Sequence, residues 1–329
     1  MERDKKIDVL KGIAIYLVVM GHVIAWFFKD FSANSDLLPT NTMALWNFIY
    51  SFHMPLFVFL SGYVFMNPQK RYSFKHIAKR CVTYTIPFTT MGVLLYCWRG
   101  GKLDNYWYFR SLVEFSLLLF VIYTGVTKFS LFRRFTPPIC VALFLVIIWE
   151  LSHIIKRYDW LDMFLDSQHI MLGVFFIIGW AYRMYKSFAD KILVNQYVLL
   201  ISMLLVFGGV VYNINIPYLK AMVSIMLALN VANVLVGKFD CRYLEAIGKE
   251  TMGIYIYHFF FTFKLFVIGT FLCEISNEGL STSIVVQLAL VLSASYVIVK
   301  CCSYIIRFLK ACPIMDLVCF GELKLFEKL

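Results

Sequence analysis

The apolar residues of this 329-residue chain come in long blocks that alternate with short polar links. The blocks 13–26, 56–65, 141–149 and 197–212 contain no Asp, Glu, Lys or Arg. A helix needs about 20 mostly apolar residues to cross a hydrocarbon core of roughly 30 Å. The alternation therefore predicts an all-α, polytopic integral membrane protein with about ten transmembrane helices. The expected spans are 8–28, 42–66, 77–98, 107–125, 136–155, 167–185, 193–212, 217–237, 251–272 and 282–306.

Lysine and arginine residues are concentrated at the two ends of the chain and in every second link between the expected spans. Loops rich in these residues stay on the cytoplasmic side of a membrane. We therefore expect both termini in the cytoplasm. The polar links are short and no second-domain linker is visible, so residues 1–329 are expected to form a single membrane domain with no appended soluble domain.

Composition adds to this interpretation, since 61% of the residues are hydrophobic and only 16% are charged. Soluble domains carry about 25% charged residues. The formal net charge of +11 is spread over alternate loops, which makes nucleic acid an unexpected partner. Anionic headgroups of membrane lipids, or an anionic cytoplasmic substrate, suit that distribution better. The oligomeric state is left open.

Two ionisable residues mark one face of the first expected helix. Each such group inside a bilayer costs several kcal/mol unless it is paired or faces a cavity. Lys11 and His22 are eleven residues apart, which places them on the same helix face, about 16–17 Å apart along the axis. Lys11 then lies at the cytoplasmic mouth and His22 deep in the span. A core histidine bonded to a carbonyl group, with Lys11 reaching lipid headgroups, is an equally open interpretation.

The second expected helix carries His53 at a depth near that of His22, followed by Pro55. Proline removes a backbone donor and loosens the preceding turn. Irregular backbone at membrane depth usually lines a cavity. Two histidines at one depth on consecutive helices favour a functional site, although a structural hydrogen-bonded pair would give the same pattern.

A basic cluster stands at the entrance of the third expected helix, where Lys75, Lys79 and Arg80 follow a cytoplasmic loop. Such cations suit phosphate recognition. An ordinary positively charged cytoplasmic loop remains the alternative. On the ninth expected helix, Tyr255 and His258 are one turn apart.

Metal binding is not expected. Glu150 and His153 have the spacing of one half of a di-iron site, but the sequence holds no second copy of that motif.

The order and spacing of these motifs resemble the acyltransferase-3 family of membrane acyltransferases, which includes bacterial O-antigen and other surface-glycan O-acetyltransferases. The matching segments are 7–22, 52–63, 75–87 and 253–258, and the resemblance covers essentially the whole chain. The family pattern has an arginine where this chain has Lys11. Lysine keeps the charge but loses the bidentate fork.

The resemblance implies a multi-pass protein of the bacterial plasma (inner) membrane that transfers an acyl group, most often acetyl, from acyl-CoA. The acceptor would be a hydroxyl of a lipid-linked or surface glycan. No permanently bound cofactor is implied, because acetyl-CoA is a substrate.

On this interpretation His22 and His53 are catalytic. His22 would act as general base or carry the acyl group briefly, and His53 would orient it or stabilise the oxyanion. The donor-binding residues would be Lys11, Lys75, Lys79, Arg80 and His258. A transporter or flippase without covalent chemistry is the alternative, disfavoured because no inverted repeat is visible and the phosphate-compatible cations lie on one face.

Overall fold

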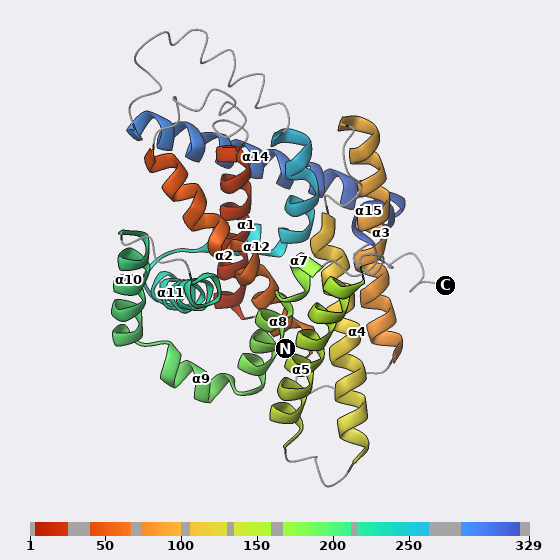
Figure 1. Cartoon of the computed structure of the whole chain (residues 1–329). Coiled ribbons are helices and arrows are strands. Elements are labelled where there is room, and N and C mark those ends of the chain that lie inside the picture. Colours follow the sequence, from red (N-terminus) through yellow and green to blue (C-terminus); the bar gives the residue numbers. More distant parts are fainter. Residues whose placement is uncertain are drawn as a thin grey trace. The chain divides into compact units, whose positions relative to one another are not determined.

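A computed structural model describes residues 4–25, 40–66, 74–99, 106–129, 135–158, 167–211, 216–262 and 284–322. The regular structure within these ranges is helical (Figure 1). Residues 251–262 form a helix that begins just after α12. The other helices are α1 (Lys5–Ile24), α2 (Thr40–Phe65), α3 (Phe74–Arg99), α4 (Trp107–Lys128), α5 (Thr136–Arg157), α7 (Ser167–Ile170), α8 (Gly173–Met184), α9 (Lys186–Leu193), α10 (Gln196–Val211), α11 (Pro217–Lys238), α12 (Arg242–Lys249), α14 (Ile284–Lys310) and α15 (Pro313–Phe320).

Within the described ranges, 7 helices are long and apolar enough to cross a membrane. Helices α9 and α10 meet at a bend of 64° and would make an eighth span if they cross together. The all-α, polytopic membrane architecture expected from the sequence is therefore confirmed, while the count of ten spans stays a prediction. The seven segments are Lys5–Ile24, Leu45–Phe65, Phe74–Trp98, Trp107–Lys128, Thr136–Arg157, Pro217–Lys238 and Leu288–Lys310.

The expected span 167–185 differs most from the structure, because a turn at residues 171–172 divides it into α7 and α8. Helix α8 has 12 residues and a length of about 18 Å, which is shorter than a hydrocarbon core of roughly 30 Å. The expected span 251–272 is helical as far as residue 262, and its remainder lies outside the described residues.

The fourth expected span contains two charged residues and nevertheless forms the continuous helix α4. Arg110 Nε lies 3.7 Å from Glu114 Oε1 one turn further along, and both side chains are about four-fifths buried. This neutralisation within one helix explains how α4 keeps two charges at membrane depth.

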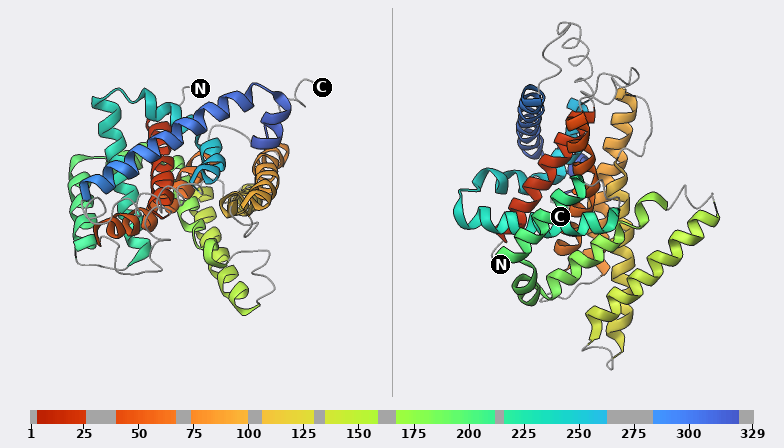
Figure 2. Two further views of the ribbon diagram at one scale, coloured as in Figure 1. Left: turned by 90° about the horizontal axis from the view of Figure 1, so that it is seen from above. Right: turned by 60° about the vertical axis from the view of Figure 1, so that its left-hand side comes forward.

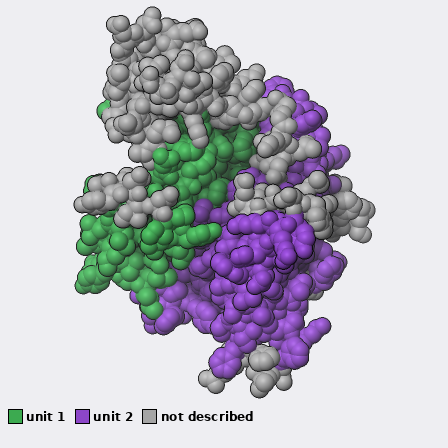
Figure 3. Space-filling view, in the orientation of Figure 1, with its two compact units in different colours: residues 1–54, 192–311 green, residues 55–191, 312–329 purple. Residues whose placement is uncertain are grey.

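The described chain divides into two compact units, shown in green and purple in Figure 3. The first contains residues 1–54 and 192–311, and the second contains residues 55–191 and 312–329. The boundary inside α2 falls at Pro55, whose ring removes one backbone donor from that helix.

In the first unit α1 is the central helix and packs against α11, α12 and α14. Helix α14 runs across α1 rather than alongside it (Figures 1 and 2). Two glycines bring α1 and α12 into backbone contact. A Cβ added at Gly12 would meet the carbonyl group of Leu244, and one added at Gly248 would meet the carbonyl group of Asp8. Close approach of this kind is how small residues let membrane helices pack.

The second unit uses the same device between α2 and α8. A Cβ at Gly62 would meet the Phe176 carbonyl group, and a Cβ at Gly179 would meet the Phe59 carbonyl group. Helix α15 packs on α3, where the Thr90 hydroxyl donates to the Val318 carbonyl oxygen over 2.7 Å.

Large apolar side chains remain exposed on the outer helices. Leu204 and Phe207 on α10 are 63% and 70% exposed, and Val146 and Trp149 on α5 are each 58% exposed. A soluble protein rarely leaves such continuous apolar surface in water. In a membrane protein these faces contact lipid chains.

Candidate functional site

His22 stands in the last turn of α1 and is half-buried. The residue before it is Gly21, where an added Cβ would lie 3.0 Å from the Cε2 atom of Tyr50. The absence of a side chain at Gly21 therefore lets the ring of Tyr50, on α2, come close to the end of α1.

Four side chains of the first unit gather at this point, namely His22, Tyr50, His53 and His258, which we call the histidine cluster. The ring centroids of His22 and His258 are 5.1 Å apart. The Tyr50 hydroxyl lies 3.5 Å from His22 Nδ1, and the Tyr50 ring centroid is 4.8 Å from that of His53. The two histidines singled out on consecutive helices are thus joined through one tyrosine, and a third histidine closes the cluster.

Two of these imidazoles have a defined tautomer. His53 Nδ1 lies 2.8 Å from the Ile49 carbonyl oxygen, and His258 Nδ1 lies 3.1 Å from the Ile254 carbonyl oxygen. A carbonyl oxygen only accepts, so Nδ1 carries the proton in both rings. In the neutral ring each Nε2 then presents a lone pair. Over the described residues, the buried Nε2 of His258 has no hydrogen-bond partner.

The three histidines differ in their exposure to solvent. His53 is 4% exposed and His258 is fully buried, whereas His22 is half-buried. The His22 imidazole is therefore the most accessible of the three to a second molecule. The Nδ1 atom of His22 faces the hydroxyl group of Tyr50 at 3.5 Å. A hydroxyl can donate or accept, so the neighbour of His22 permits either tautomer.

The residues expected to bind the donor fall into both units. Lys11 lies on α1 in the first unit, and Lys75 and Lys79 are exposed on α3 in the second. Arg80 has a structural contact as well. Its guanidinium donates to the carbonyl oxygens of Val64, over 3.1 Å, and Phe65, in the last turn of α2. It thereby satisfies acceptors that a helix end leaves unpaired.

Tyr50 was not identified from the sequence, although it contacts both His22 and His53. The available signal was its spacing from His53, since residues three apart share a helix face. The sequence favoured a structural or donor-side role for His258, and its ring centroid lies 5.1 Å from that of His22.

Over the described ranges, no group of three His, Cys, Asp or Glu side chains is arranged to hold a metal ion. His153 Nδ1 lies 2.8 Å from the Trp149 carbonyl oxygen of its own helix, α5, and its ring packs against that of Trp149.

Comparison with known proteins identifies the class. Residues 4–306 match the acyltransferase-3 family model, described as an acyltransferase domain. The chain therefore belongs to the acyltransferase-3 family, and its described helices are those of a polytopic membrane protein.

Two curated relatives are both named Nodulation protein NolL. The chain is 34% identical over 119 residues to the protein from Sinorhizobium fredii, which covers 35% of this chain and 30% of the relative. It is 34% identical over 91 residues to the protein from Mesorhizobium japonicum, covering 26% and 22%. The chain thus spans less than a third of the length of these relatives. No solved structure matches it.

Proposed function

We propose that this protein is a membrane O-acyltransferase that moves an acyl group, with acetyl the expected one, from cytoplasmic acyl-CoA to a carbohydrate hydroxyl. The acceptor would be a lipid-linked or surface glycan, as the resemblance to surface-glycan O-acetyltransferases implies. Family membership supports the acyl transfer, and the histidine cluster is the observation that carries the assignment of a site.

The cluster supplies a half-buried base with proton acceptors behind it. In the proposed step His22 removes the proton from the acceptor hydroxyl while that oxygen attacks the thioester carbonyl carbon. The resulting tetrahedral oxyanion collapses, the carbon–sulfur bond breaks, and the departing CoA sulfur takes the proton from the His22 imidazolium. The products are the O-acyl ester and CoA thiol, so that one proton moves from oxygen to sulfur.

The neighbours of His22 suit the support of this proton transfer. The Tyr50 hydroxyl is placed to hold the His22 ring through Nδ1, 3.5 Å away. His53 and His258 donate through Nδ1 to backbone carbonyl oxygens, so their Nε2 atoms act as acceptors in the neutral ring. This tautomer favours a role for His53 in orienting the cluster over donation of a hydrogen bond to the oxyanion. We assign the same role to His258, in place of the donor-side contact expected from sequence.

The donor carries several phosphate groups, and the basic residues named from the sequence suit them. We infer that donor phosphates are attracted by Lys11, eleven residues before His22 on α1. The basic residues at the start of α3 would attract them as well, namely Lys75, Lys79 and Arg80. This requires the starts of α1 and α3 on the cytoplasmic side, as the distribution of lysine and arginine supports.

The wider arrangement is part of the same proposal. It comprises ten spans, both termini in the cytoplasm, a single membrane domain over residues 1–329 and a location in the bacterial plasma membrane. The two compact units found by contact are then subdivisions of that one membrane domain. Membership of an acyltransferase family favours this proposal over the transporter or flippase alternative.

The proposal is tested by acyl transfer in proteoliposomes with acetyl-CoA labelled in the acetyl group and a glycan-containing membrane extract. His22→Gln should lower the rate about 10²- to 10⁴-fold, the usual contribution of a general base. Lys11→Met should mainly raise the KM for acetyl-CoA. His153→Gln is the matched control, because His153 lies in the second unit and outside the cluster, and it should leave the rate unchanged.

Label that reaches a glycan with wild type and His153→Gln, but not with His22→Gln, supports both the reaction and the site. Transfer that persists in His22→Gln would remove His22 from the chemistry. Absence of CoA release from any acyl-CoA with the wild-type protein would contradict the acyl-CoA assignment and return transport to first place.

A further inference from the structure

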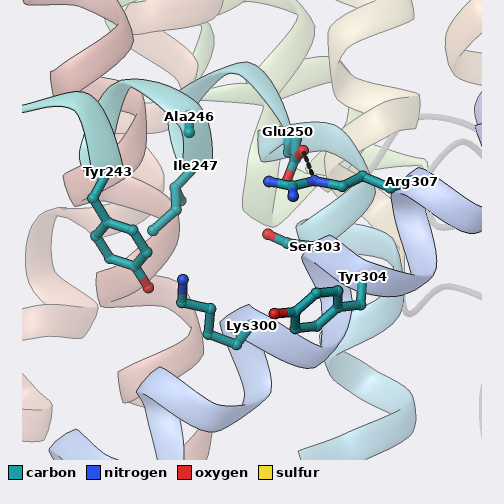
Figure 4. A pocket seen from close by; sticks show the side chains of 8 residues that line it. All are labelled: Tyr243, Ala246, Ile247, Glu250, Lys300, Ser303, Tyr304 and Arg307. Atoms are coloured by element: carbon teal, nitrogen blue, oxygen red, sulfur yellow. Dashed lines mark hydrogen bonds and ion pairs between the residues drawn. The ribbon is translucent and has the colours of Figure 1, made fainter.

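A second polar site lies in the first unit, on the face where α14 meets α12 (Figure 4). On α14 it is lined by Lys300, Ser303, Tyr304 and Arg307. These positions follow the spacing i, i+3, i+4 and i+7, which defines one stripe on a helix. The rest of α14 is strongly apolar, so a polar stripe on this face requires a polar partner.

Lys300 is the most unusual member of that stripe. It lies ten residues before the end of α14 and inside the candidate membrane span Leu288–Lys310, about 15 Å from the helix end. Its ammonium is 4.7 Å from the ring centroid of Tyr243 and 5.6 Å from that of Tyr296. Cation–π contacts of this kind partly offset the loss of water and hold the ammonium toward α12.

Helix α12 contributes the opposite wall. Tyr243 and Glu250 are seven residues apart and so lie on one face of this region. Glu250 Oε1 accepts a hydrogen bond from Arg307 Nε over 3.3 Å, and the Glu250 side chain is 18% exposed. In Figure 4 the two terminal nitrogens of Arg307 are directed into the space that Ser303 also faces. With Lys300, Arg307 and Glu250 ionised, the site carries one net positive charge.

The hydroxyl of Tyr243 remains a donor at ordinary pH. Burial, with smaller contributions from Tyr296 and Tyr16, raises the pKa of Tyr243 from 10.0 to about 12. Two cations and three hydroxyl groups, those of Tyr243, Ser303 and Tyr304, therefore converge on one space. This combination suits a phosphate group, because phosphate oxygens accept hydrogen bonds from ammonium, guanidinium and hydroxyl groups.

The surroundings identify what carries the phosphate. Beside the polar stripe, α14 exposes Tyr296, Val297 and Phe308, the last being 79% exposed. A free anion gains nothing from such a surface, whereas lipid chains do. We propose that the site between α12 and α14 binds the phosphate of an anionic membrane lipid, whose chains lie along the exposed apolar face of α14.

The test is lipid binding by the full chain in detergent micelles, measured by native mass spectrometry during titration with phosphatidylglycerol or phosphatidylcholine. The wild type should retain one phosphatidylglycerol in preference to phosphatidylcholine. Lys300→Met and Arg307→Gln should each weaken retention roughly fivefold or more, the usual effect of removing one basic residue at an anionic membrane. Lys300→Arg keeps the charge and should keep the lipid, which excludes a general loss of folding as the cause.

Lys249→Met is the matched control, because it removes one exposed positive charge from α12 outside the site. Its retention of phosphatidylglycerol should stay within twofold of wild type. An equal loss with Lys249→Met would overturn the proposal in favour of diffuse attraction to anionic lipid. So would equal retention of the two lipids.

A second arm separates a lipid phosphate from a soluble one. Inorganic phosphate and CoA are added to lipid-free micelles, and thermal stabilisation of wild type is compared with that of Lys300→Met. We expect no stabilisation that depends on Lys300. Stabilisation by CoA that is lost in Lys300→Met would overturn the lipid assignment and identify the site as one for donor phosphates.

Discussion

Replacing Gly248 by alanine should destabilise the protein although it adds only one methyl group. The ideal Cβ would lie 2.7 Å from the Asp8 carbonyl carbon on α1 and 3.1 Å from the Gly12 nitrogen. Carbon atoms in favourable contact are about 3.5–4.0 Å apart. Helices α1 and α12 would therefore have to separate by about 1 Å at their closest point.

The size of the effect follows from two opposing contributions. Overpacking of this kind costs about 1–3 kcal/mol. Alanine in a helix is favoured over glycine by about 0.5–1 kcal/mol, and by less near a helix end, where Gly248 stands. The net destabilisation is therefore about 0.5–2.5 kcal/mol, which corresponds to a fall in melting temperature of roughly 1–4 °C for a chain of this length.

The assay is thermal unfolding of purified protein in one detergent, followed by size-exclusion chromatography with fluorescence detection. Gly208→Ala in α10 is the matched control, because nothing lies within 4 Å of a Cβ at that position. It should be neutral or slightly stabilising. Gly248→Ala should also reduce acyl transfer more than the control, because α1 carries His22 and α12 leads into the helix that carries His258.

A melting temperature for Gly248→Ala equal to or above that of Gly208→Ala would refute the reasoning. It would mean that the α1 and α12 backbones are not in contact at Asp8 and Gly12. The distance between His22 and His258 would then no longer be set by this pair of helices.

Three further predictions concern single side chains. Tyr50→Phe should slow acyl transfer about two- to tenfold, as expected for the loss of one neutral hydrogen bond to His22. Tyr50→Ala should slow it more, because the ring is lost as well. Equal rates for wild type and Tyr50→Phe would exclude a role of the Tyr50 hydroxyl in acyl transfer. Arg80→Gln should lower the free energy of unfolding by roughly 1–2 kcal/mol, because the carbonyl oxygens at the end of α2 lose a charged donor. Lys75→Met, at an exposed position of α3, should leave stability unchanged in the same thermal assay. The pKa of Tyr243 is raised to about 12 in the folded protein, so the contribution of this phenol to stability is present below pH 10 and is lost as the pH rises from 10 through 12. Tyr243→Phe should therefore make unfolding less dependent on pH in that range. An alkaline profile equal to that of wild type would contradict the partial burial of this phenol.

The membrane class of this protein was predictable from its sequence because apolar periodicity and length act within one helix at a time. The apolar blocks determined where most helices form, as α2, α5 and α11 illustrate. They did not predict the turn at residues 171–172, which divides the expected span 167–185 into α7 and the 12-residue helix α8. Apolar content does not report such a turn.

The motif residues were predictable as single positions but not as an arrangement. Helical spacing placed Lys11 and His22 on one face of α1, because that geometry is local. It could not show that His258, from the far end of the chain, lies beside His22, or that Tyr50 joins His22 to His53. Those contacts depend on which helices meet.

Only the tertiary structure decided those pairings, and the physical reason is shape. Glycines at 12 and 248 let α1 approach α12 closely enough for their backbones to touch, and Gly21 leaves room for Tyr50. In the same way, only the tertiary structure brings the ring of Tyr243, on α12, within 4.7 Å of the Lys300 ammonium on α14. A pattern along one helix defines the face that is buried. The helix that packs against that face depends on the shape of segments far away in the sequence.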